Sequence, residues 1–461
     1  MHHSSSLSIP SLQGAFSGRV IAPGDAAYDE ARAIFGGGFN GHPAVIVRAA
    51  DAADVVKVVK LARETGLPLA VRSGGHSGAG HSTTEGGIVL DLRDLKSLDI
   101  DTDRRSAWAG AGLTAGEYSA GVGAHGLATG FGDTGSVGIG GITLGGGIGY
   151  LSRKHGLTID SLLGAEVVTA AGEIVDVSGA SHPDLFWAIR GGGGNFGVVT
   201  RFHNRLHPVD QIVGGMLMLP ATPETIAGAV QASENAPDEL SAIINVMPAP
   251  PMPFIPPSHH GQLVVMILLC CAANAEDGTR AIAPFRALAT PIVDMVRPMR
   301  YPEIFPPEDG SYHPKAVGKT LFIDTVDRDV AGTILDHLRR SDASMRVVQL
   351  RVLGGAMARI PRDATAFAHR DSRMLAVVAA FYDGPEDRPQ RAAWTEASAG
   401  ALNQGRSGAY VGFMMDDGEA SVRSVYPDAT WNRLASVKAR YDPNNLFRLN
   451  HNVPPVRQAT A

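Results

Sequence analysis

Short apolar runs alternate with polar segments along the first two hundred residues, at spacings typical of both strands and helices. Residues 44–47 form a strand-like run, and after Asp51 the side chains of Val55, Val59 and Ala62 recur at helical spacing. On the same grounds we predict strands at residues 69–72, 88–92, 107–111 and 197–202, a hairpin at 166–177, and helices at 114–125 and 184–189. This half is expected to combine short strands with few helices.

After residue 207 the pattern changes to longer strands and helices in alternation. We predict strands near residues 242–246, 263–270, 347–352 and 374–380, and helices near 223–234, 277–288, 329–340 and 388–402. One further helix is expected at 431–440, and no internal repeat is visible. The change to longer elements indicates a second domain, and the mixture of strands and helices predicts an α+β fold.

Composition narrows the class of protein. The chain has 461 residues, of which 44% are hydrophobic and 19% charged, so it carries enough apolar material for a packed core. Its net charge of -6 offers no basic surplus for a nucleic-acid partner. The run at 263–273 is too short to span a membrane, and the adjacent Cys270 and Cys271 provide no disulfide framework. Because the N-terminal stretch also lacks the features of a signal peptide, we expect a cytoplasmic protein.

Glycine is concentrated in two places. It supplies nine of the eighteen residues from 132 to 149 and five of the seven from 191 to 197. Gly130, Gly132 and Gly135 satisfy GxGxxG, but the glycines that follow are too dense for the helix that a dinucleotide site of the Rossmann type requires, so that interpretation is rejected. Closely spaced glycines let backbone N–H groups approach an anionic or planar ligand, and sharp turns are the alternative.

A histidine in a second glycine loop changes the balance between these alternatives. The segment VRSGGHS (71–77) places His76 directly after a predicted strand, and three further motifs follow in order: TGSVGIGGITLGGGIGYLSRKHGLTID (134–160), DLFWAIRGGGGNFGVVT (184–200) and YDPNNLFRLNHN (441–452). Together they resemble the vanillyl-alcohol-oxidase-type flavoproteins, within them the berberine-bridge-enzyme-like branch.

The resemblance implies a two-domain FAD-binding fold of the PCMH type. The FAD-binding domain would comprise residues 1–207 and 415–461, and a substrate-binding domain of residues 208–414 would cover the flavin with an antiparallel sheet. In the family the loop histidine bonds covalently to the flavin, a role that falls to His76. Members with two covalent bonds carry a cysteine six residues before the double glycine, where this chain has Thr134, so no second link is expected. The neighbouring Asp133 occupies a place associated with oxygen access, which leaves oxidase and dehydrogenase activity both open.

The same resemblance implies a set of cofactor contacts. The histidine loop is expected around the pyrophosphate, the glycine tract around the ADP and isoalloxazine, residues 197–199 near the adenine, and two C-terminal asparagines near the flavin ring, although turn capping is their alternative role. The expected residues are Arg72, Ser73, Gly74, Gly75, His76, Ser77, Gly132, Asp133, Thr134, Gly135, Gly138, Gly140, Gly141, Gly145, Gly146, Gly149, Gly197, Val198, Val199, Asn450 and Asn452.

The catalytic side of the site is less defined by the sequence. Relatives often use tyrosines as bases, but this chain has Phe413 and Ile148 at the matching places. The remaining candidates, each with a structural role as its alternative, are Tyr410, Tyr150, His155, Gln349, Arg351, and His313 with Tyr312. Gln349 and Arg351 alternate on one predicted strand, so they are expected to point to one face. The histidines show no zinc-binding spacing, and no metal is expected.

The leading hypothesis is an FAD-dependent oxidoreductase with one histidyl bond to its flavin. It would oxidise an alcohol or amine C–H bond of a small-molecule substrate by hydride transfer to flavin N5, with oxygen as the electron acceptor. A dehydrogenase or oxygenase of the same fold is one alternative. A protein that sequesters flavin or a ligand without turnover is another, because the family's tyrosines are missing. The sequence identifies neither the substrate nor the oligomeric state.

Overall fold

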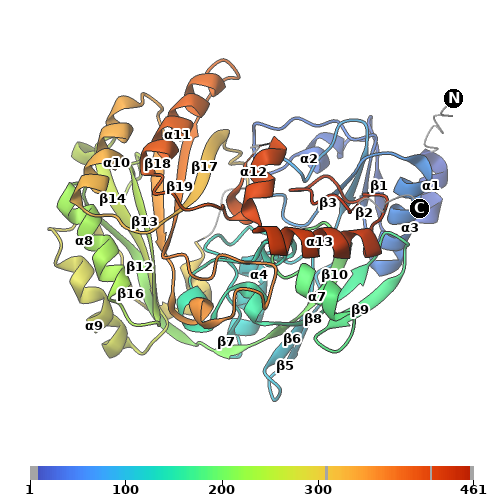
Figure 1. The fold of residues 1–461 in the computed structure, drawn as a ribbon, viewed down its shortest axis with the longest axis horizontal. Helices are drawn as coiled ribbons and strands as arrows, with labels where there is room; N and C mark the ends of the chain where they lie inside the picture. Colours follow the sequence, from blue (N-terminus) through green and yellow to red (C-terminus); the bar gives the residue numbers. More distant parts are fainter. Residues whose placement is uncertain (1–8, 307–309, 416–417, 457–461) are drawn as a thin grey trace.

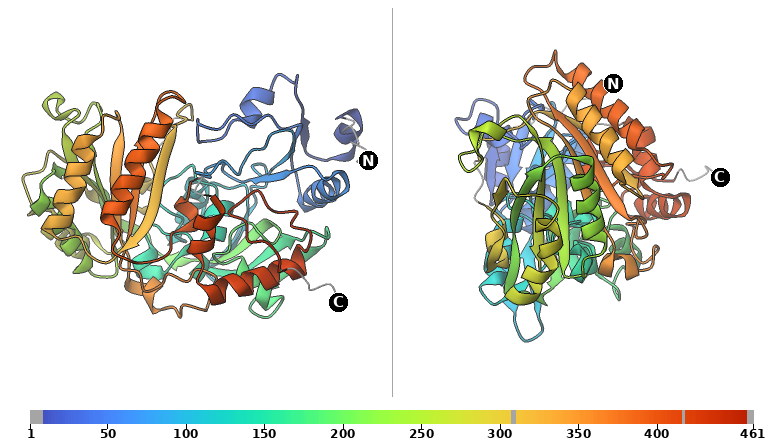
Figure 2. Two further views of the ribbon diagram at one scale, coloured as in Figure 1. Left: turned by 45° about the horizontal axis from the view of Figure 1, so that its top comes forward. Right: turned by 90° about the vertical axis from the view of Figure 1, so that its left-hand side faces the viewer.

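The computed structural model describes residues 9–306, 310–415 and 418–456. Three sheets organise it, two in the first half of the chain and one large sheet in the second half, as Figures 1 and 2 show. A two-stranded ribbon, β7 (Leu127–Ala128) with β11 (His207–Pro208), lies where the chain passes from the first half to the second.

The first sheet is small and mostly parallel. Its strand order is β1 (Arg19–Ile21), β2 (Val45–Arg48), β4 (Ile88–Asp91) and β3 (Leu69–Arg72), with only β1 antiparallel. Helix α3 (Ala52–Thr65) connects β2 to β3. It begins where the Asp51 side chain accepts from the Asp54 N–H and ends at Gly66, whose φ is +70°. Two short helices precede this unit, α1 (Ile9–Ala15) and α2 (Tyr28–Arg32).

The second sheet is antiparallel and supports the glycine tract. Its order is β5 (Leu98–Asp101), β6 (Ser106–Gly110), β10 (Val198–Arg205), β8 (Leu162–Val168) and β9 (Ile174–Ser178). Helix α4 (Ala115–Gly123) begins with a capping box between Thr114 and Glu117. The remaining helices of this half are α5 (Ile139–Gly145), α6 (Ser152–His155), a 3-10 turn at Thr158–Asp160, and α7 (Pro183–Ala188).

The third sheet has eight antiparallel strands. Its order is β15 (Val293–Asp294), β12 (Gln211–Pro220), β14 (Leu263–Cys271), β13 (Leu240–Pro248), β18 (Arg346–Val352), β19 (Met374–Phe381) and β17 (Ala316–Ile323), with β16 (Arg297–Arg300) also on β12. Alternate residues of these strands pack under four helices, α8 (Pro223–Glu234), α9 (Ala275–Arg286), α10 (Arg328–Arg340) and α11 (Arg388–Leu402). The helices cover one face, on the left in Figure 1. The opposite face is therefore turned towards the first half of the chain.

The C-terminal segment returns to the first half. Helix α12 (Gly418–Val425) leads to α13 (Asp428–Tyr441), which contacts α7 (Figure 1). The fully buried Lys438 on α13 donates from Nζ to Asp442 (2.6 Å) and to the carbonyl oxygens of Asn195 and Phe447. This set of bonds fixes the last turn of α13 and the segment after it against the first half.

Most of the buried apolar residues follow the same division, although two smaller clusters combine residues of both halves. The largest core cluster joins residues 45–206 to residues of the C-terminal segment and also includes Ala366, Ala409, Val411 and Met414, whereas a second cluster is confined to residues 213–402. We propose that these are two domains, with boundaries near residues 207 and 415.

The main departure from the sequence-based expectation lies in the glycine tract. We judged it too dense in glycine for a helix, yet α5 forms within it. The reason is tertiary packing, since a Cβ on Gly140 would lie only 2.9 Å from the Ser73 Cβ, so glycine permits a close contact that a larger residue would prevent. Strands β1, β12 and β17 were not predicted, and strand β14 lies near its predicted place.

Candidate active site

A cavity of about 420 Å³ lies where the histidine loop, the glycine tract, the start of β10 and the C-terminal segment meet. Its size is within the range of cofactor and ligand sites. Of the residues expected to contact a cofactor, those that line it are Ser73, Gly74, Gly75, His76, Ser77, Gly132, Asp133, Thr134, Gly138, Gly140, Gly141, Gly145, Gly197, Val198, Val199 and Asn450. The fold thus brings together residues from all four motifs.

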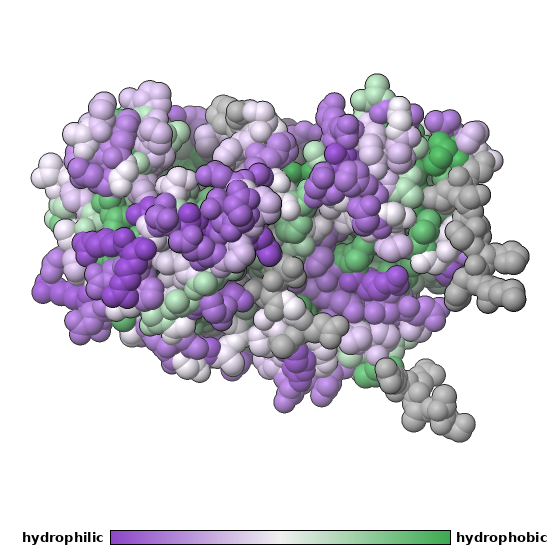
Figure 3. Space-filling model, turned by 90° about the horizontal axis from the view of Figure 1, so that it is seen from above, coloured by the Kyte–Doolittle hydropathy of each residue, from purple (hydrophilic) through white to green (hydrophobic). Residues whose placement is uncertain are grey.

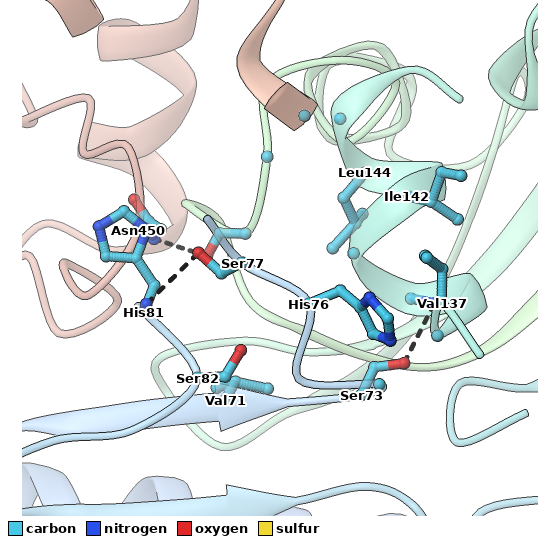
Figure 4. Close-up of a pocket in the computed structure, with 18 of the residues that line it drawn as sticks. Val71, Ser73, His76, Ser77, His81, Ser82, Val137, Ile142, Leu144 and Asn450 are labelled. Atoms are coloured by element: carbon cyan, nitrogen blue, oxygen red, sulfur yellow. Dashed lines mark hydrogen bonds between the residues drawn. The ribbon is translucent and has the colours of Figure 1, made fainter. Parts of the chain in front are cut away.

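His76 is held at a defined position in this cavity. The loop that carries it follows β3 and places the imidazole near Val137 and helix α5, as Figure 4 shows. The Phe35 ring stacks on the imidazole, with ring centroids 4.1 Å apart and an interplanar angle of 17°. The Ser136 hydroxyl oxygen lies 3.1 Å from His76 Nε2. A face and an edge of the ring are therefore both fixed by neighbouring side chains.

The backbone of the cavity wall fits a large ligand. A Cβ built on Gly141 or on Gly194 meets no heavy atom within 4 Å, although both residues line the cavity. A side chain at either place would therefore extend into space that a ligand can fill. No Lys or Arg is among the described residues of the lining, so a diphosphate there would be bound by backbone N–H groups and hydroxyls.

Arg72 does not take the predicted place beside a diphosphate. Val71 lines the cavity, and because strand side chains alternate, Arg72 points to the other face of β3. There its Nη2 donates to Asp91 at 2.9 Å and to the Ala31 carbonyl oxygen at 2.6 Å. Burial raises the pKa of Asp91, but the nearby Arg72 and Arg93 outweigh this effect and hold that pKa at about 2. The guanidinium therefore supports the sheet beneath the loop.

Four other expected cofactor contacts lie outside the lining: Gly135, Gly146, Gly149 and Asn452. Gly149 instead packs on Gly132, because a Cβ there would come within 2.5 Å of its backbone. Asn450 does line the cavity. Its amide nitrogen donates to the carbonyl oxygens of Gly194 and Phe447, while its buried Oδ1 has no hydrogen-bond partner. That oxygen can accept from a bound donor.

Tyr410 is the one predicted catalytic candidate that lines the cavity. Its hydroxyl oxygen accepts from the backbone N–H of Gly147 at 2.9 Å and of Ile148 at 3.4 Å. Burial raises the pKa of the phenol, so it is neutral near pH 7. The hydroxyl oxygen already accepts two backbone hydrogen bonds from the glycine tract, which argues against a role as a general base.

Gln349 and Arg351 point to one face of β18, as predicted, and build a directional chain of hydrogen bonds. Asn245 accepts from Gln349 Nε2 at 2.8 Å, Gln349 Oε1 accepts from Arg351 Nε at 2.8 Å, and Arg351 Nη2 donates to Asp133 Oδ2 at 2.7 Å. The guanidinium also lies 4.7 Å above the Phe413 ring. The chain of bonds thus joins the large sheet to Asp133, which faces the cavity.

Two other candidates lie away from the cavity. Tyr150 is buried in an apolar cluster with Tyr301, and burial raises its pKa well above its ordinary value. His155 stacks on His207 at 4.1 Å, and its pKa is lowered to about 3, chiefly by burial and then by the neighbouring His207 and Lys154. Their surroundings are those of structural residues.

Tyr312 and His313 lie beside the histidine loop but outside the cavity lining. Tyr312 is exposed and meets the edge of Phe35, and His313 Nδ1 is 2.9 Å from the Ile34 carbonyl oxygen. Sequence reasoning missed Phe35 and Ser136, which contact His76 directly. Ser136 sits inside the glycine tract and could have been noticed there, whereas Phe35 belongs to no motif.

Among the described residues no group of His, Cys, Asp and Glu is arranged to hold a metal ion. Within the same ranges, no helix has the length and apolar character needed to cross a membrane. On the face seen in Figure 3, hydrophilic side chains predominate and hydrophobic ones gather only in small groups.

The fold and the cavity define an FAD-binding flavoprotein of the PCMH type. A family model described as "FAD binding domain" matches residues 43–178, and one described as "Berberine and berberine like" matches residues 409–454. Over 98% of this chain and 99% of the relative, the sequence is 33% identical to (R)-6-hydroxynicotine oxidase of Paenarthrobacter nicotinovorans. The chain therefore belongs to the berberine-bridge-enzyme-like family of FAD-linked oxidoreductases, as its motifs predict.

More distant relatives agree with this assignment. Berberine bridge enzyme-like 6 of Arabidopsis thaliana is 28% identical over 89% of this chain and 81% of its own length. The crystal structure of 6-hydroxy-D-nicotine oxidase from Arthrobacter nicotinovorans matches with a TM-score of 0.84 at 28% identity, over 95% of this chain and 98% of that one. These likenesses favour an oxidoreductase over a protein that only sequesters a ligand.

Proposed function

We propose that this protein is an FAD-dependent oxidase that carries its flavin on His76 and oxidises an alcohol or amine C–H bond of a small molecule. The observation that supports it best is the placement of His76, held by Phe35 and Ser136 at the wall of a glycine-lined cavity. A histidine restrained in this way serves a covalent bond to a ligand better than a surface or core role.

A single covalent link is supported by where the cysteines lie. The chain has only Cys270 and Cys271, which are adjacent on β14, buried and free. Neither lines the cavity, whereas Thr134, which the resemblance matches to the cysteine of relatives with two links, does. We therefore propose one bond, through His76, and no thioether.

On the substrate side, Asp133 takes the role that a tyrosine has in many relatives. It is the one carboxylate among the described residues that line the cavity. Arg351 binds its Oδ2, which leaves Oδ1 to accept an O–H or N–H of the substrate. When bound there, FAD would supply the acceptor for the hydride of the substrate C–H bond, and oxygen would take up both electrons as hydrogen peroxide. Phe413 and Ile148 add apolar surface that excludes water.

The amine or alcohol class is supported by the relative named (R)-6-hydroxynicotine oxidase and by this lining. The test is rapid mixing of the substrate-reduced protein with air-saturated buffer, after screening amines and alcohols for anaerobic bleaching of the flavin. Fast reoxidation with stoichiometric peroxide supports an oxidase. Slow reoxidation, with rapid turnover on an artificial electron acceptor, would show a dehydrogenase and overturn the proposed acceptor.

A further inference from the structure

A second, smaller cavity lies between the glycine tract and the large sheet. Its volume is about 20 Å³, and its lining includes Gly149, Arg153 on α6, Ser241 on β13 and Arg351 on β18. Ile243 lies opposite Arg351 in the sheet, and Ser241 precedes Ile243 by two residues, so the side chains of Ser241 and Arg351 point to the same face. The cavity has room for one small ion or one water molecule.

Three residues of this lining each carry a buried polar atom that has no hydrogen-bond partner within the part of the chain that the structure describes. The three atoms are Arg153 Nε, Arg351 Nη1 and Ser241 Oγ. Solvent does not replace the partners, because the exposed fractions of the three residues are only 6%, 5% and 7%. Buried polar groups are normally hydrogen-bonded, so three unpartnered ones at a single cavity indicate a ligand there.

Arg153 also differs from the other buried cations in its charge balance. Among the described residues six Lys and Arg side chains are buried, and five of them form an ion pair with a carboxylate: Arg72, Arg351, Arg370, Arg391 and Lys438. Arg153 forms no such pair within the same ranges. Its Nη1 and Nη2 donate instead to the carbonyl oxygens of Leu353 at 2.7 Å and Ala236 at 2.9 Å.

The nearest acidic influence on Arg153 does not compensate its charge. Asp238 raises the pKa of Arg153, but burial has the larger effect and lowers it overall. The Asp238 carboxylate accepts a hydrogen bond from Arg359 at 2.7 Å and is partly exposed. Since a guanidinium stays protonated in proteins, Arg153 is a buried positive charge that needs an anion.

We propose that the small cavity binds one monatomic anion, such as chloride, between Arg153, Arg351 and Ser241. Asp133 already neutralises Arg351, so the two arginines leave one net positive charge, which a monovalent anion balances. Each of the three groups can donate a hydrogen bond to it. A water molecule brings no charge and would leave Arg153 uncompensated, and about 20 Å³ is too small for sulfate or phosphate.

The ion would join the two halves of the chain beside the larger cavity. Arg153 follows the glycine tract in the first half, whereas Ser241 and Arg351 belong to the large sheet. The Nε and Nη2 edge of Arg351 binds Gln349 and Asp133, which leaves Nη1 for the ion. The anion thus restrains the guanidinium that holds Asp133.

The test combines bromide diffraction with urea unfolding of the full-length protein. Crystals are soaked in sodium bromide and measured at the bromine absorption edge, where a bound bromide gives an anomalous peak. In solution, unfolding is followed over increasing sodium chloride, and sodium gluconate, whose anion is too large for the cavity, keeps the ionic strength constant. Ser241→Ala removes one donor. Ser119→Ala is the matched control, because Ser119 Oγ is also buried without a partner but lies on α4, outside this cavity.

Bromide should appear at the three groups, and chloride should lower the equilibrium constant of unfolding by up to about tenfold for each tenfold rise in its concentration. Ser241→Ala should need about 10- to 150-fold more chloride for the same effect, because it loses one hydrogen bond to a charged group, whereas Ser119→Ala should respond as wild type does. A cavity without an anomalous peak, or equal unfolding in chloride and gluconate, would overturn the proposal in favour of water. A chloride effect that Ser241→Ala leaves unchanged would show that the ion binds elsewhere and overturn its assignment to this cavity.

Discussion

Gly141 provides a direct test of where the FAD lies. It sits within helix α5 on the cavity wall, and a built Cβ there meets nothing within 4 Å. Gly141→Ala should therefore fold without strain, and in an exposed helical position alanine is expected to stabilise the protein by about 0.4–1 kcal/mol. The added methyl group would occupy space that the cofactor needs.

The expected cost to FAD binding follows from the cost of overpacking. An extra methyl group in a filled site typically costs about 1–3 kcal/mol, which corresponds to a dissociation constant about 5- to 140-fold higher. The measurement is titration of FAD fluorescence quenching in a His76→Ala background, where binding is reversible, together with urea unfolding of the flavin-free protein. Gly332→Ala, in helix α10 and also free of close neighbours, is the matched control.

The two variants separate the effects of fold and site. Gly332→Ala should gain similar helix stability and bind FAD as the background protein does, because Gly332 is not among the residues lining the cavity. If Gly141→Ala also binds FAD with unchanged affinity, the cofactor does not contact this part of the wall, and the assignment of the cavity is refuted. If it unfolds, the packing described for α5 is wrong.

Three further predictions concern ionisable side chains in the interior of the protein. Lys438→Met is expected to lower the free energy of unfolding in urea by about 3–5 kcal/mol, because it leaves the buried carboxylate of Asp442 without its cation; a loss below about 1 kcal/mol, typical of surface pairs, would contradict this. A double-mutant cycle of Arg351→Met and Asp133→Asn, measured by the free energy of unfolding, should give a favourable interaction energy of about 0.5–3 kcal/mol between the two side chains. If the effects of the two substitutions simply add, this ion pair does not couple the two halves of the chain. Folding lowers the pKa of His155 from its ordinary 6.5 to about 3, so the folded chain binds fewer protons and the free energy of unfolding falls as pH drops from about 6.5 towards 3. His155→Phe should weaken this pH dependence. An unchanged slope of unfolding free energy against pH would refute the prediction.

Much of the fold is predictable from the sequence because its signals are local. Strand β14 is a continuous apolar run, and α3 combines a cap, a helical period and a terminal glycine. Most of the residues that line the cavity belong to motifs whose members lie close together along the chain. What local pattern does not contain is the approach of distant segments, which is why helix α5 was missed and why Phe35 was not connected with His76.

Arg72 illustrates a different kind of error. Its place within the histidine motif indicated a ligand contact, but alternation along β3 decides where the side chain points. Because Leu69 and Val71 line the cavity, Arg72 must face away from it, towards Asp91 opposite it in β4. The period-two rule was sufficient to predict this, once one residue of the strand was known to face the cavity.

The most direct test of the whole account is the mass of the denatured protein and of its proteolytic peptides. Purified protein is unfolded in acid, freed of unbound flavin, and digested. The account predicts one FAD per chain, carried by the peptide that contains His76, with Thr134 and both cysteines unmodified. An unmodified chain with all flavin in the supernatant, or flavin attached at another residue, would contradict it.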